Sequence, residues 1–524
     1  MNNNLRITGL ASGIDTEEMV QNLMRAERVK VDRVEQDRQT LLWRQEIYND
    51  LNKDFANFIL NSRKAFGLTS VRYDGTLVPN SYKNLNWVKK GTSSDETIAT
   101  VSTTGKAMDS NFELEIKELA KSAIIVDDGI NEECIRNIKD IKIEVKVGDE
   151  NREITIDSAD SMDDLIKKIN TSKVKKDDKD VSSGISAFYD KENRKLFLQT
   201  AETGENVEIK LSYEGESSKS TLSQGSSAKV VYNGVELKYS SNRFTINNIN
   251  IEAKSIGKTS VTIATDVDGI YEKVDQFVKD YNELVDKTNK LLGEKRYRDY
   301  KPLTAEQKKG MEKADVDLWE EKAKSGLLRS DDIISRTMLN TRQSIYKEFK
   351  TEDGFSGTFK LITEIGISTE QYSRGSAGGK LVIDEQKLKD AIAKNPEDVM
   401  ELLFKESAPE VVDEKGNPQL GGFVTRIQDN LMSGMEEIIK KSGTGENADL
   451  YRGVKGNILL DFVSKHSSIS LIDKDVLQYS RKIDDLNEML FRKENNYYAK
   501  FAAMEKAISR MNQQSGWLMQ QSMK

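Results

Sequence analysis

Residues 476–518 read VLQYSRKIDDLNEMLFRKENNYYAKFAAMEKAISRMNQQSGWL and carry the strongest pattern in the chain. Apolar or aromatic residues recur there in one unbroken seven-residue series: Val476, Ile483, Leu490, Tyr497, Met504, Met511 and Leu518. Three more apolar residues flank this series: Leu486, Phe501 and Ile508. A seven-residue repeat over several heptads is typical of helices that wind around one another. Because one helix cannot bury such a stripe by itself, we expect a partner helix.

Residues 6–66 form a second, less regular stretch of the same kind. One register there holds Val20, Val34, Leu41, Tyr48 and Phe55, and Glu27 interrupts it. We expect the two terminal stretches to pair within one chain, between chains, or both. The alternative is an ordinary helical hairpin that closes a globular domain. We also expect the two seams to lack a partner inside an isolated chain, so that the ends stay exposed and disordered until the protein assembles.

The first helix has a clear start signal. Asp15 is placed to act as its N-cap, with Glu18 three residues later as in a capping box. Ile14 precedes the cap and is placed to pack on Met19 as a hydrophobic staple.

The middle of the chain alternates between apolar and polar residues, which predicts half-buried strands. The clearest runs are at 112–116, 141–147, 154–156 and 185–198, followed by a hairpin around Asn233-Gly234 and strands up to residue 263. Ser161 should cap a short helix. Two segments look unstructured: the charged residues 171–184 as a loop, and the Ser- and Gly-rich residues 212–228 as a linker.

Helical spacing returns after residue 268. Helices are predicted at 268–292, at 396–404 with Asn395 as N-cap, and at 423–438. Ser330 is expected to cap a further helix, and residues 295–313 to form a loop or a short helix. The face of residues 48–66 can supply these helices with a packing partner.

Composition excludes several function classes. The chain has 524 residues, 37% hydrophobic and 32% charged, with a net charge of -8 that argues against a nucleic-acid partner. We find no apolar run of about 18 residues that would span a membrane and no apolar segment of a secretory signal near the start. Cys134 and His466 are the single cysteine and histidine, so any acid–base or metal chemistry would depend almost entirely on carboxylates. We therefore expect no enzyme, cofactor or metal site.

Several short motifs occur in a characteristic order along the chain. They are LRITGLASGIDTEEMV at 5–20, AER at 26–28, FVKDYNEL at 277–284, IGI at 365–367, GKLVID at 379–384 and NPEDV at 395–399. Together they resemble the flagellar filament cap protein family, also called flagellar hook-associated protein 2. Residues 154–207 resemble a module that recurs in flagellins and their relatives. The family often has a proline after the AER motif, whereas this chain has Val29-Lys30-Val31, so we expect the first helix to continue unbroken.

The resemblance implies an α+β multidomain fold. It would comprise terminal helices forming a coiled-coil leg, a helical-bundle domain and two strand-rich head domains, the outer inserted in the inner. The expected boundaries are 1–45 and 467–524 for the leg segments, 46–67 with 268–466 for the helical domain, 68–125 with 223–267 for the inner head, and 126–222 for the outer head.

The resemblance also implies a function. The chain would be a structural capping protein at the distal tip of the bacterial flagellar filament, where it oligomerises, retains exported flagellin and promotes its folding and polymerisation. The implied partners are further copies of itself, flagellin, the hook–filament junction protein and a cytoplasmic export chaperone at the C-terminal helix. The implied location is extracellular, after secretion through the flagellar export apparatus. The alternative is an adhesin that presents its heads to a host surface.

The self-assembly residues expected on the leg helices are Val20, Val34, Leu41, Ile483, Leu486, Leu490, Tyr497, Met504, Ile508, Met511 and Leu518. Five methionines follow residue 488: Met489, Met504, Met511, Met519 and Met523. Methionine adapts its shape to changing partners, which suits a helix that must bind and release. Plain core filling explains these methionines equally well.

Overall fold

The computed structural model describes residues 15–71, 77–103, 106–176, 179–214, 219–349, 358–371, 378–412, 418–419, 421–447 and 470–522. The chain divides into two units. The first combines Met1–Asn80 with Lys273–Lys524, and the second is Ser81–Glu272. Each unit is described by itself below.

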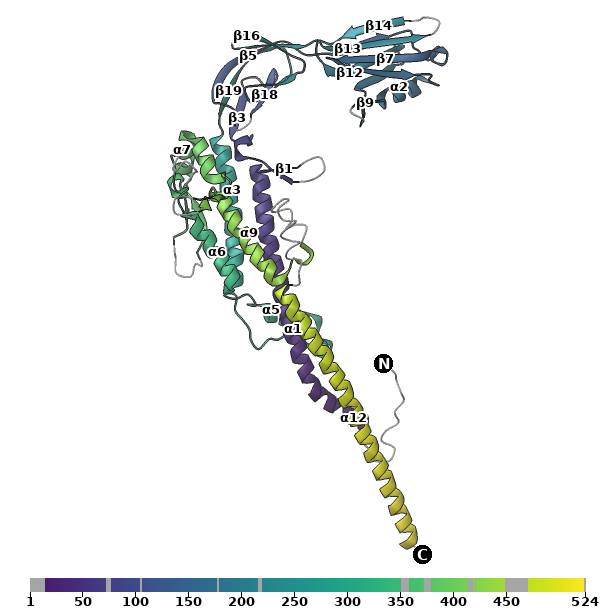
Figure 1. Ribbon diagram of the computed structural model, residues 1–524, viewed down its shortest axis with the longest axis vertical. Helices are drawn as coiled ribbons and strands as arrows, with labels where there is room; N and C mark the ends of the chain where they lie inside the picture. The colour runs from purple at the N-terminus through teal and green to yellow at the C-terminus, as the bar shows by residue number, and fades with distance from the viewer. Residues whose placement is uncertain are drawn as a thin grey trace. The chain divides into compact units, whose positions relative to one another are not determined.

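Helix α1 (Thr16–Phe66) begins the first unit and runs for 51 residues without a break (Figure 1). Asp15 caps it, because its carboxylate accepts hydrogen bonds from the backbone N–H groups of Glu17 and Glu18 at 3.1 and 2.9 Å. The helix ends at Gly67, whose φ of 69° only glycine adopts readily. The predicted cap and the unbroken course through residues 29–31 are confirmed. Ile14, and with it the predicted staple, lies outside the described residues.

The remaining helices of this unit come mostly from the second half of the chain. Those in the described residues are α3 (Val267–Gly293, which starts in the second unit), α4 (Ala305–Lys309), α5 (Lys313–Lys324), α6 (Asp332–Ile345), α7 (Glu385–Lys394), α8 (Pro396–Phe404), α9 (Phe423–Ser442) and α12 (Leu471–Ser522). Short antiparallel strand pairs join them: β1 (Thr69–Val71) with β2 (Leu77–Pro79), β20 (Ile367–Thr369) with β21 (Leu381–Ile383), and β22 (Ala408–Val412) with β23 (Pro418–Gln419). The sequence did not predict α5.

Aromatic side chains hold α1, α3, α8 and α9 together. The ring centroid of Phe277 lies 5.3 Å from Phe58, 5.6 Å from Phe66 and 6.2 Å from Phe423. The Phe66 ring also meets Phe404 edge-on at 4.6 Å. Offset and edge-on ring pairs add to the gain from burying these large side chains. The contacts confirm that residues 48–66 present a packing face to helices from the second half of the chain.

The second unit contains two separate apolar cores. The first lies between a five-stranded antiparallel sheet and a three-stranded one, with Phe112, Leu114 and Ile116 at its centre. The five-stranded sheet has the order β16 (Val235–Tyr239), β15 (Ala228–Tyr232), β5 (Ser110–Glu118), β19 (Gly257–Thr265) and β3 (Lys89–Ser93). The three-stranded sheet has the order β17 (Arg243–Ile246), β18 (Ile249–Ala253) and β4 (Ala99–Thr103). Asn233 and Gly234 have φ of 47° and 86°, as the tight turn of the predicted hairpin requires.

The second core is built from residues 123–213 and shares no residue with the first. Its four-stranded sheet has the order β14 (Lys219–Gln224), β13 (Val207–Glu214), β7 (Lys139–Val147) and β8 (Glu150–Ile156). Its three-stranded sheet has the order β11 (Ile185–Asp190), β12 (Lys195–Thr203) and β6 (Ser122–Asp127). Helix α2 (Met162–Asn170) packs on this core with Met162, Leu165 and Ile169. The predicted cap is confirmed, since the Ser161 hydroxyl accepts a hydrogen bond from the Asp164 N–H at 3.2 Å.

Three local predictions are wrong. Residues 171–184 are not a loop, because β9 (Lys173–Lys176) pairs with β10 (Lys179–Ser182) and sets Val174 opposite Val181. Residues 212–228 are not a linker, because β14 pairs along β13 and continues the sheet. The cap of α6 is Asp331 and not Ser330, whose φ of 54° places it in a turn. In segments 171–184 and 212–228, pairing with a neighbouring strand forms a sheet although the amino-acid composition favours an irregular segment.

We propose that the outer core folds independently of the inner one. The bounds of β6 and β14 place this segment at 122–224, slightly wider than the expected 126–222. Lys121 and Ser226 flank the segment and exchange backbone hydrogen bonds of 2.8 and 3.0 Å, so a short Gly-Ser linker can span its ends. Replacing 122–224 by such a linker should leave the cooperative melting of the rest intact, measured by calorimetry. A broad, non-cooperative transition in the deletion variant would show instead that the two cores depend on each other.

Candidate self-assembly surface on the terminal helices

Helix α12 packs along α1 in the first unit (Figure 1). Val31 and Val34 of α1 form one buried cluster with Ile483 and Leu490 of α12. Three half-buried side chains complete this cluster: Met24, Tyr479 and Leu486. The heptad series of α12 thus meets the less regular stripe of α1 within one chain.

Polar contacts show that the two helices run antiparallel. Lys493 forms an ion pair with Glu27 at 2.7 Å, and Arg38 donates a hydrogen bond to the Ser480 hydroxyl at 3.4 Å. Residue numbers therefore rise along α1 while they fall along α12. The hydrogen bond from Lys493 holds the pKa of Glu27 below its ordinary value. Glu27 occupies a position of the apolar register of α1, and its charged side chain forms an ion pair with Lys493 of the partner helix.

The structure corrects the expectation that the seams have no partner in an isolated chain. Leu490 is only 8% exposed, and Ile483 is buried as well. Because α1 and α12 belong to the same polypeptide, each buries the other's stripe without a second copy. A seven-residue repeat specifies a partner helix but does not say from which chain it comes.

The predicted assembly residues fall into three classes. Val20, Val34, Ile483 and Leu490 are buried; Leu41, Leu486, Tyr497, Met504 and Ile508 are half-buried; Met511 and Leu518 are exposed. The antiparallel register places Thr16 of α1 level with about residue 504 of α12. The last turns of α12 therefore extend beyond the described start of α1.

This extending end carries a group of exposed apolar side chains. Met511, Trp517, Leu518 and Met519 are 63%, 58%, 59% and 65% exposed. Trp517 was not among the predicted residues, although a tryptophan within a polar helix end is a usable signal. We call residues 505–522, with these four side chains, the α12 end.

A polar junction fixes the other end of α12. Gln45 of α1 donates hydrogen bonds from Nε2 to the Ser442 carbonyl of α9 and to Asp473 of α12, both at 2.7 Å. Ser470 and Asp473 cap α12 reciprocally, with the hydroxyl accepting from the Asp473 N–H and the carboxylate accepting from the Ser470 N–H. Burial alone would raise the pKa of Asp473, but the hydrogen bonds from Ser470 and Gln45 hold it below its ordinary value.

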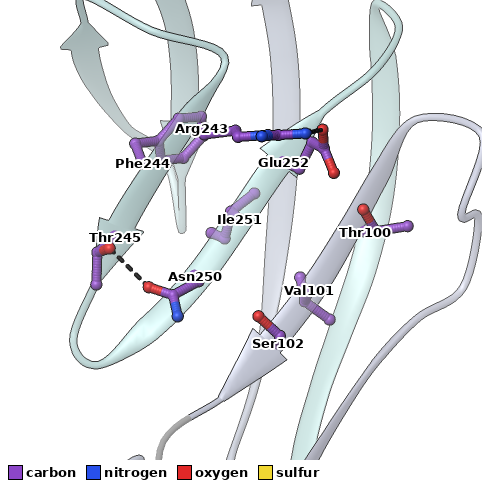
Figure 2. A pocket seen from close by; sticks show the side chains of 9 residues that line it. All are labelled: Thr100, Val101, Ser102, Arg243, Phe244, Thr245, Asn250, Ile251 and Glu252. Atoms are coloured by element: carbon purple, nitrogen blue, oxygen red, sulfur yellow. Dashed lines mark hydrogen bonds and ion pairs between the residues drawn. The ribbon is translucent and has the colours of Figure 1, made fainter. Parts of the chain in front are cut away.

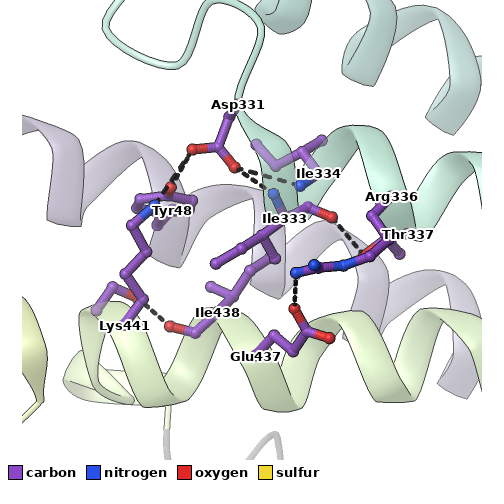
Figure 3. A network of polar contacts seen from close by, with 10 residues as sticks. Tyr48, Asp331, Ile333, Ile334, Arg336, Thr337, Glu437, Ile438 and Lys441 are labelled. Atoms are coloured by element: carbon purple, nitrogen blue, oxygen red, sulfur yellow. Dashed lines mark hydrogen bonds and ion pairs between the residues drawn. The ribbon is translucent and has the colours of Figure 1, made fainter.

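Asp331 connects α1, α6 and α9 through a second group of polar contacts (Figure 3). Its carboxylate caps α6 by accepting from the Ile333 and Ile334 N–H groups, accepts a hydrogen bond from the Tyr48 hydroxyl, and lies 3.4 Å from the Lys441 ammonium. Burial is the main cause of the raised pKa of Tyr48, and Asp331 adds to it. One buried carboxylate therefore connects three helices.

Replacing Asp331 by alanine should destabilise the first unit by about 2–4 kcal/mol. The variant loses a helix cap worth about 1 kcal/mol and leaves the buried Tyr48 hydroxyl and the Lys441 ammonium without this acceptor, at about 1–3 kcal/mol. Urea unfolding of the full chain measures the difference. Asp332→Ala changes the adjacent, exposed carboxylate and is the matched control. Equal unfolding midpoints for the two variants would show that the Asp331 contacts do not stabilise the helices.

A pocket of about 510 Å³ lies on the sheet formed by β17, β18 and β4 (Figure 2). Its polar groups are paired with each other: Arg243 with Glu252 at 2.7 Å, and Thr245 with Asn250 at 2.8 Å. Pairs of this kind between neighbouring strands are typical of the solvated face of a sheet.

The structure describes only one of the two residues, Cys134 and His466, that sequence analysis considered for acid–base or metal chemistry. Cys134 donates a hydrogen bond to the Gly129 carbonyl at 2.9 Å, and His466 lies outside the described residues. Within the described ranges, no three His, Cys, Asp or Glu side chains are grouped to hold a metal ion. Likewise, no helix in the described part of the chain is long and apolar enough to cross a bilayer.

Family models match the chain at both ends and in the middle. A model described as the flagellar hook-associated protein 2 C-terminus matches residues 225–513, which is more than half of the chain. The chain belongs to the flagellar hook-associated protein 2 family. The N-terminal model of the same family matches residues 12–123, and a flagellin hook IN motif matches residues 140–202, within the outer core. The resemblance stated from the sequence motifs is confirmed, and the family is one of structural flagellar cap proteins.

Two curated relatives and one solved structure are similar to this chain. A flagellar hook-associated protein 2 from Halalkalibacterium halodurans is 26% identical over 566 aligned residues, covering 98% of this chain and 99% of the relative. The one from Salmonella typhimurium is 26% identical over 402 residues, covering 73% of this chain and 71% of the relative. A crystal structure of the flagellar cap protein FliD from Escherichia coli is similar with a TM-score of 0.49 and 19% identity, covering 74% of this chain and 96% of that one.

Proposed function

We propose that several copies of this chain assemble into the cap at the distal tip of a bacterial flagellar filament, where they retain exported flagellin and promote its folding and polymerisation. The observation that carries the proposal is the α12 end, whose four large apolar side chains are all more than half exposed. Solvent exposure of such a group is unfavourable, and covering it in an assembly recovers the free energy of burial.

The α12 end suits a contact that must form and break. Among the described residues a single helix presents it, so binding must order that helix against its partner, and this cost reduces the net affinity. Two of its four side chains are methionines, which adapt to differently shaped partners. A cap that moves along a growing filament needs contacts of this moderate strength.

The partners follow from this surface and from the family. Other copies of the chain and flagellin would cover the α12 end at the filament tip, next to the hook–filament junction protein at the start of assembly. Before export, a cytoplasmic chaperone would cover the same helix and prevent premature association. The chain would then leave through the flagellar export apparatus and act outside the cell.

The oligomeric state of the full chain tests the proposal. The parent should scatter light as an assembly of several 59.2 kDa chains, with a mass that depends on concentration. The double variant Met511→Asp, Leu518→Asp should scatter as a single chain. A double variant with the parent's mass at every concentration would remove the α12 end from the assembly surface.

One observation favours a second role as an adhesin. On the sheet formed by β11, β12 and β6, Phe188 is 52% exposed and stacks on Phe197 with ring centroids 4.5 Å apart. Val126 lies opposite Phe197 on the next strand, so the three side chains form one cross-strand row. Exposed aromatic rows occur at binding surfaces. Retention of a host-surface protein by the full chain in a pull-down would support this role, and its absence would leave the cap function alone.

A further inference from the structure

Arg426, in the first turn of α9, is a buried cation with unused hydrogen-bond donors. Its side chain is 2% exposed. Nη1 donates hydrogen bonds to the carbonyls of Ser344 and Lys347, at 2.8 and 2.7 Å, where α6 ends. Nε and Nη2 are buried and have no hydrogen-bond partner among the described residues. The two carbonyls thus satisfy only one side of the guanidinium.

Arg426 forms no ion pair with a carboxylate in the described part of the chain, although Asp429 lines the same pocket. The nearby carboxylate of Asp429 accepts a hydrogen bond from the Ser407 hydroxyl at 2.5 Å and acts electrostatically on Arg63 instead. Burial lowers the pKa of Arg426 to about 10. A buried cation without a paired anion is strongly unfavourable, so an arrangement of this kind calls for a missing anion.

A pocket of about 380 Å³ lies beside this guanidinium, between α6 and α9. Besides Arg426 it is lined by Asn340, Gln343 and Ser344 of α6, by Lys347 just after α6, by Ser407, and by Asp429 and Asn430 of α9. The amide and ammonium N–H groups of Asn340, Gln343, Lys347 and Asn430 are donors of the kind that oxyanions need. The one carboxylate in the lining, Asp429, accepts a hydrogen bond from the Ser407 hydroxyl. The N-terminal turns of α9 add the positive end of a 20-residue helix.

We propose that this Arg426 pocket binds an oxyanion, either a free carboxylate or phosphate ion or the carboxylate of an acidic side chain of a protein partner. The unused Nε and Nη2 donors would form the parallel pair of hydrogen bonds that a guanidinium makes with a carboxylate. Gln343 and Lys347 are exposed at the rim, so their side chains can rotate to admit the ion and then close on it. The competing account is that Arg426 only satisfies the carbonyls at the end of α6.

Thermal unfolding of the full chain separates the two accounts. The probes are inorganic phosphate, acetate and N-acetylglutamate amide, each compared with chloride at equal ionic strength. A ligand that binds the folded state raises the melting temperature in proportion to its occupancy. We expect at least one probe to raise the melting temperature with saturation, and its Kd to weaken about tenfold or more in Lys347→Gln. Lys309→Gln, an exposed lysine on α4, is the control and should bind like the parent.

The pattern among the probes identifies the source of the anion. Binding of phosphate or acetate supports a site for a free ion, and binding of N-acetylglutamate amide alone supports a site for an acidic side chain. The proposal is overturned if no probe raises the melting temperature above the chloride control, or if Lys347→Gln binds as tightly as the parent. Arg426→Lys keeps the charge but loses the paired donors, and where it folds it should lose most of the response to the ion. If it does not fold, the Lys347→Gln comparison still decides.

Discussion

Replacing Leu490 by aspartate should separate α12 from α1 in the isolated chain. The leucine lies in the buried cluster with Val31, Val34 and Ile483, so the variant loses about 2 kcal/mol of apolar burial. Placing a carboxylate there without a partner adds about 1–3 kcal/mol. We therefore expect a loss of about 3–5 kcal/mol in the pairing of the two helices. Urea unfolding followed by circular dichroism measures it as an earlier loss of helical signal.

The adjacent residue provides the matched control. Phe491 is 64% exposed, so Phe491→Asp removes an apolar side chain of similar size from the same turn of helix without entering the seam. It should unfold nearly like the parent. If Leu490→Asp and Phe491→Asp had the same unfolding curve, the pairing of α1 with α12 inside one chain would be wrong, and the seam would be free for another copy.

Replacing Phe277 by alanine should destabilise the helical part of the first unit by about 3–5 kcal/mol. The ring contacts Phe58, Phe66 and Phe423, so its removal leaves a cavity where α1, α3 and α9 meet. The midpoint of urea unfolding reports the loss. Phe491→Ala truncates an exposed phenylalanine and should change the midpoint by less than about 0.5 kcal/mol. A Phe277→Ala variant as stable as Phe491→Ala would show that this aromatic cluster does not hold the helices together.

The sequence predicts those features that depend on neighbours along the chain. Asp15 caps α1 because its carboxylate reaches N–H groups two and three residues away, and Asn233-Gly234 turns a hairpin because both residues tolerate positive φ. The strands with clean alternation, such as 112–116, were predicted for the same reason. The motif order also led to the family, which the family model across 225–513 confirmed.

Features that depend on distant residues were not predictable. Lys493 and Glu27 are far apart in sequence, so nothing local indicated that the interrupted register of α1 would be completed within the same chain. The segment 171–184 reads as a loop because lysine and aspartate dominate it, yet Val174 and Val181 pair across a hairpin. The sequence does not indicate a role for Arg426, because its side chain becomes buried only when α9 packs against the end of α6.

Flagellin retention by cells whose own cap protein is replaced by a variant tests the central claim most directly. The claim is that the α12 end carries the assembly contact while the buried seam holds the chain together. The double variant Met511→Asp, Leu518→Asp should melt like the parent as a purified chain, because both side chains are already exposed. Its cells should release flagellin monomer into the medium and swim poorly. Leu471→Asp, an exposed position at the opposite end of α12, should leave retention unchanged. Normal filaments and no released flagellin with the double variant would contradict the account.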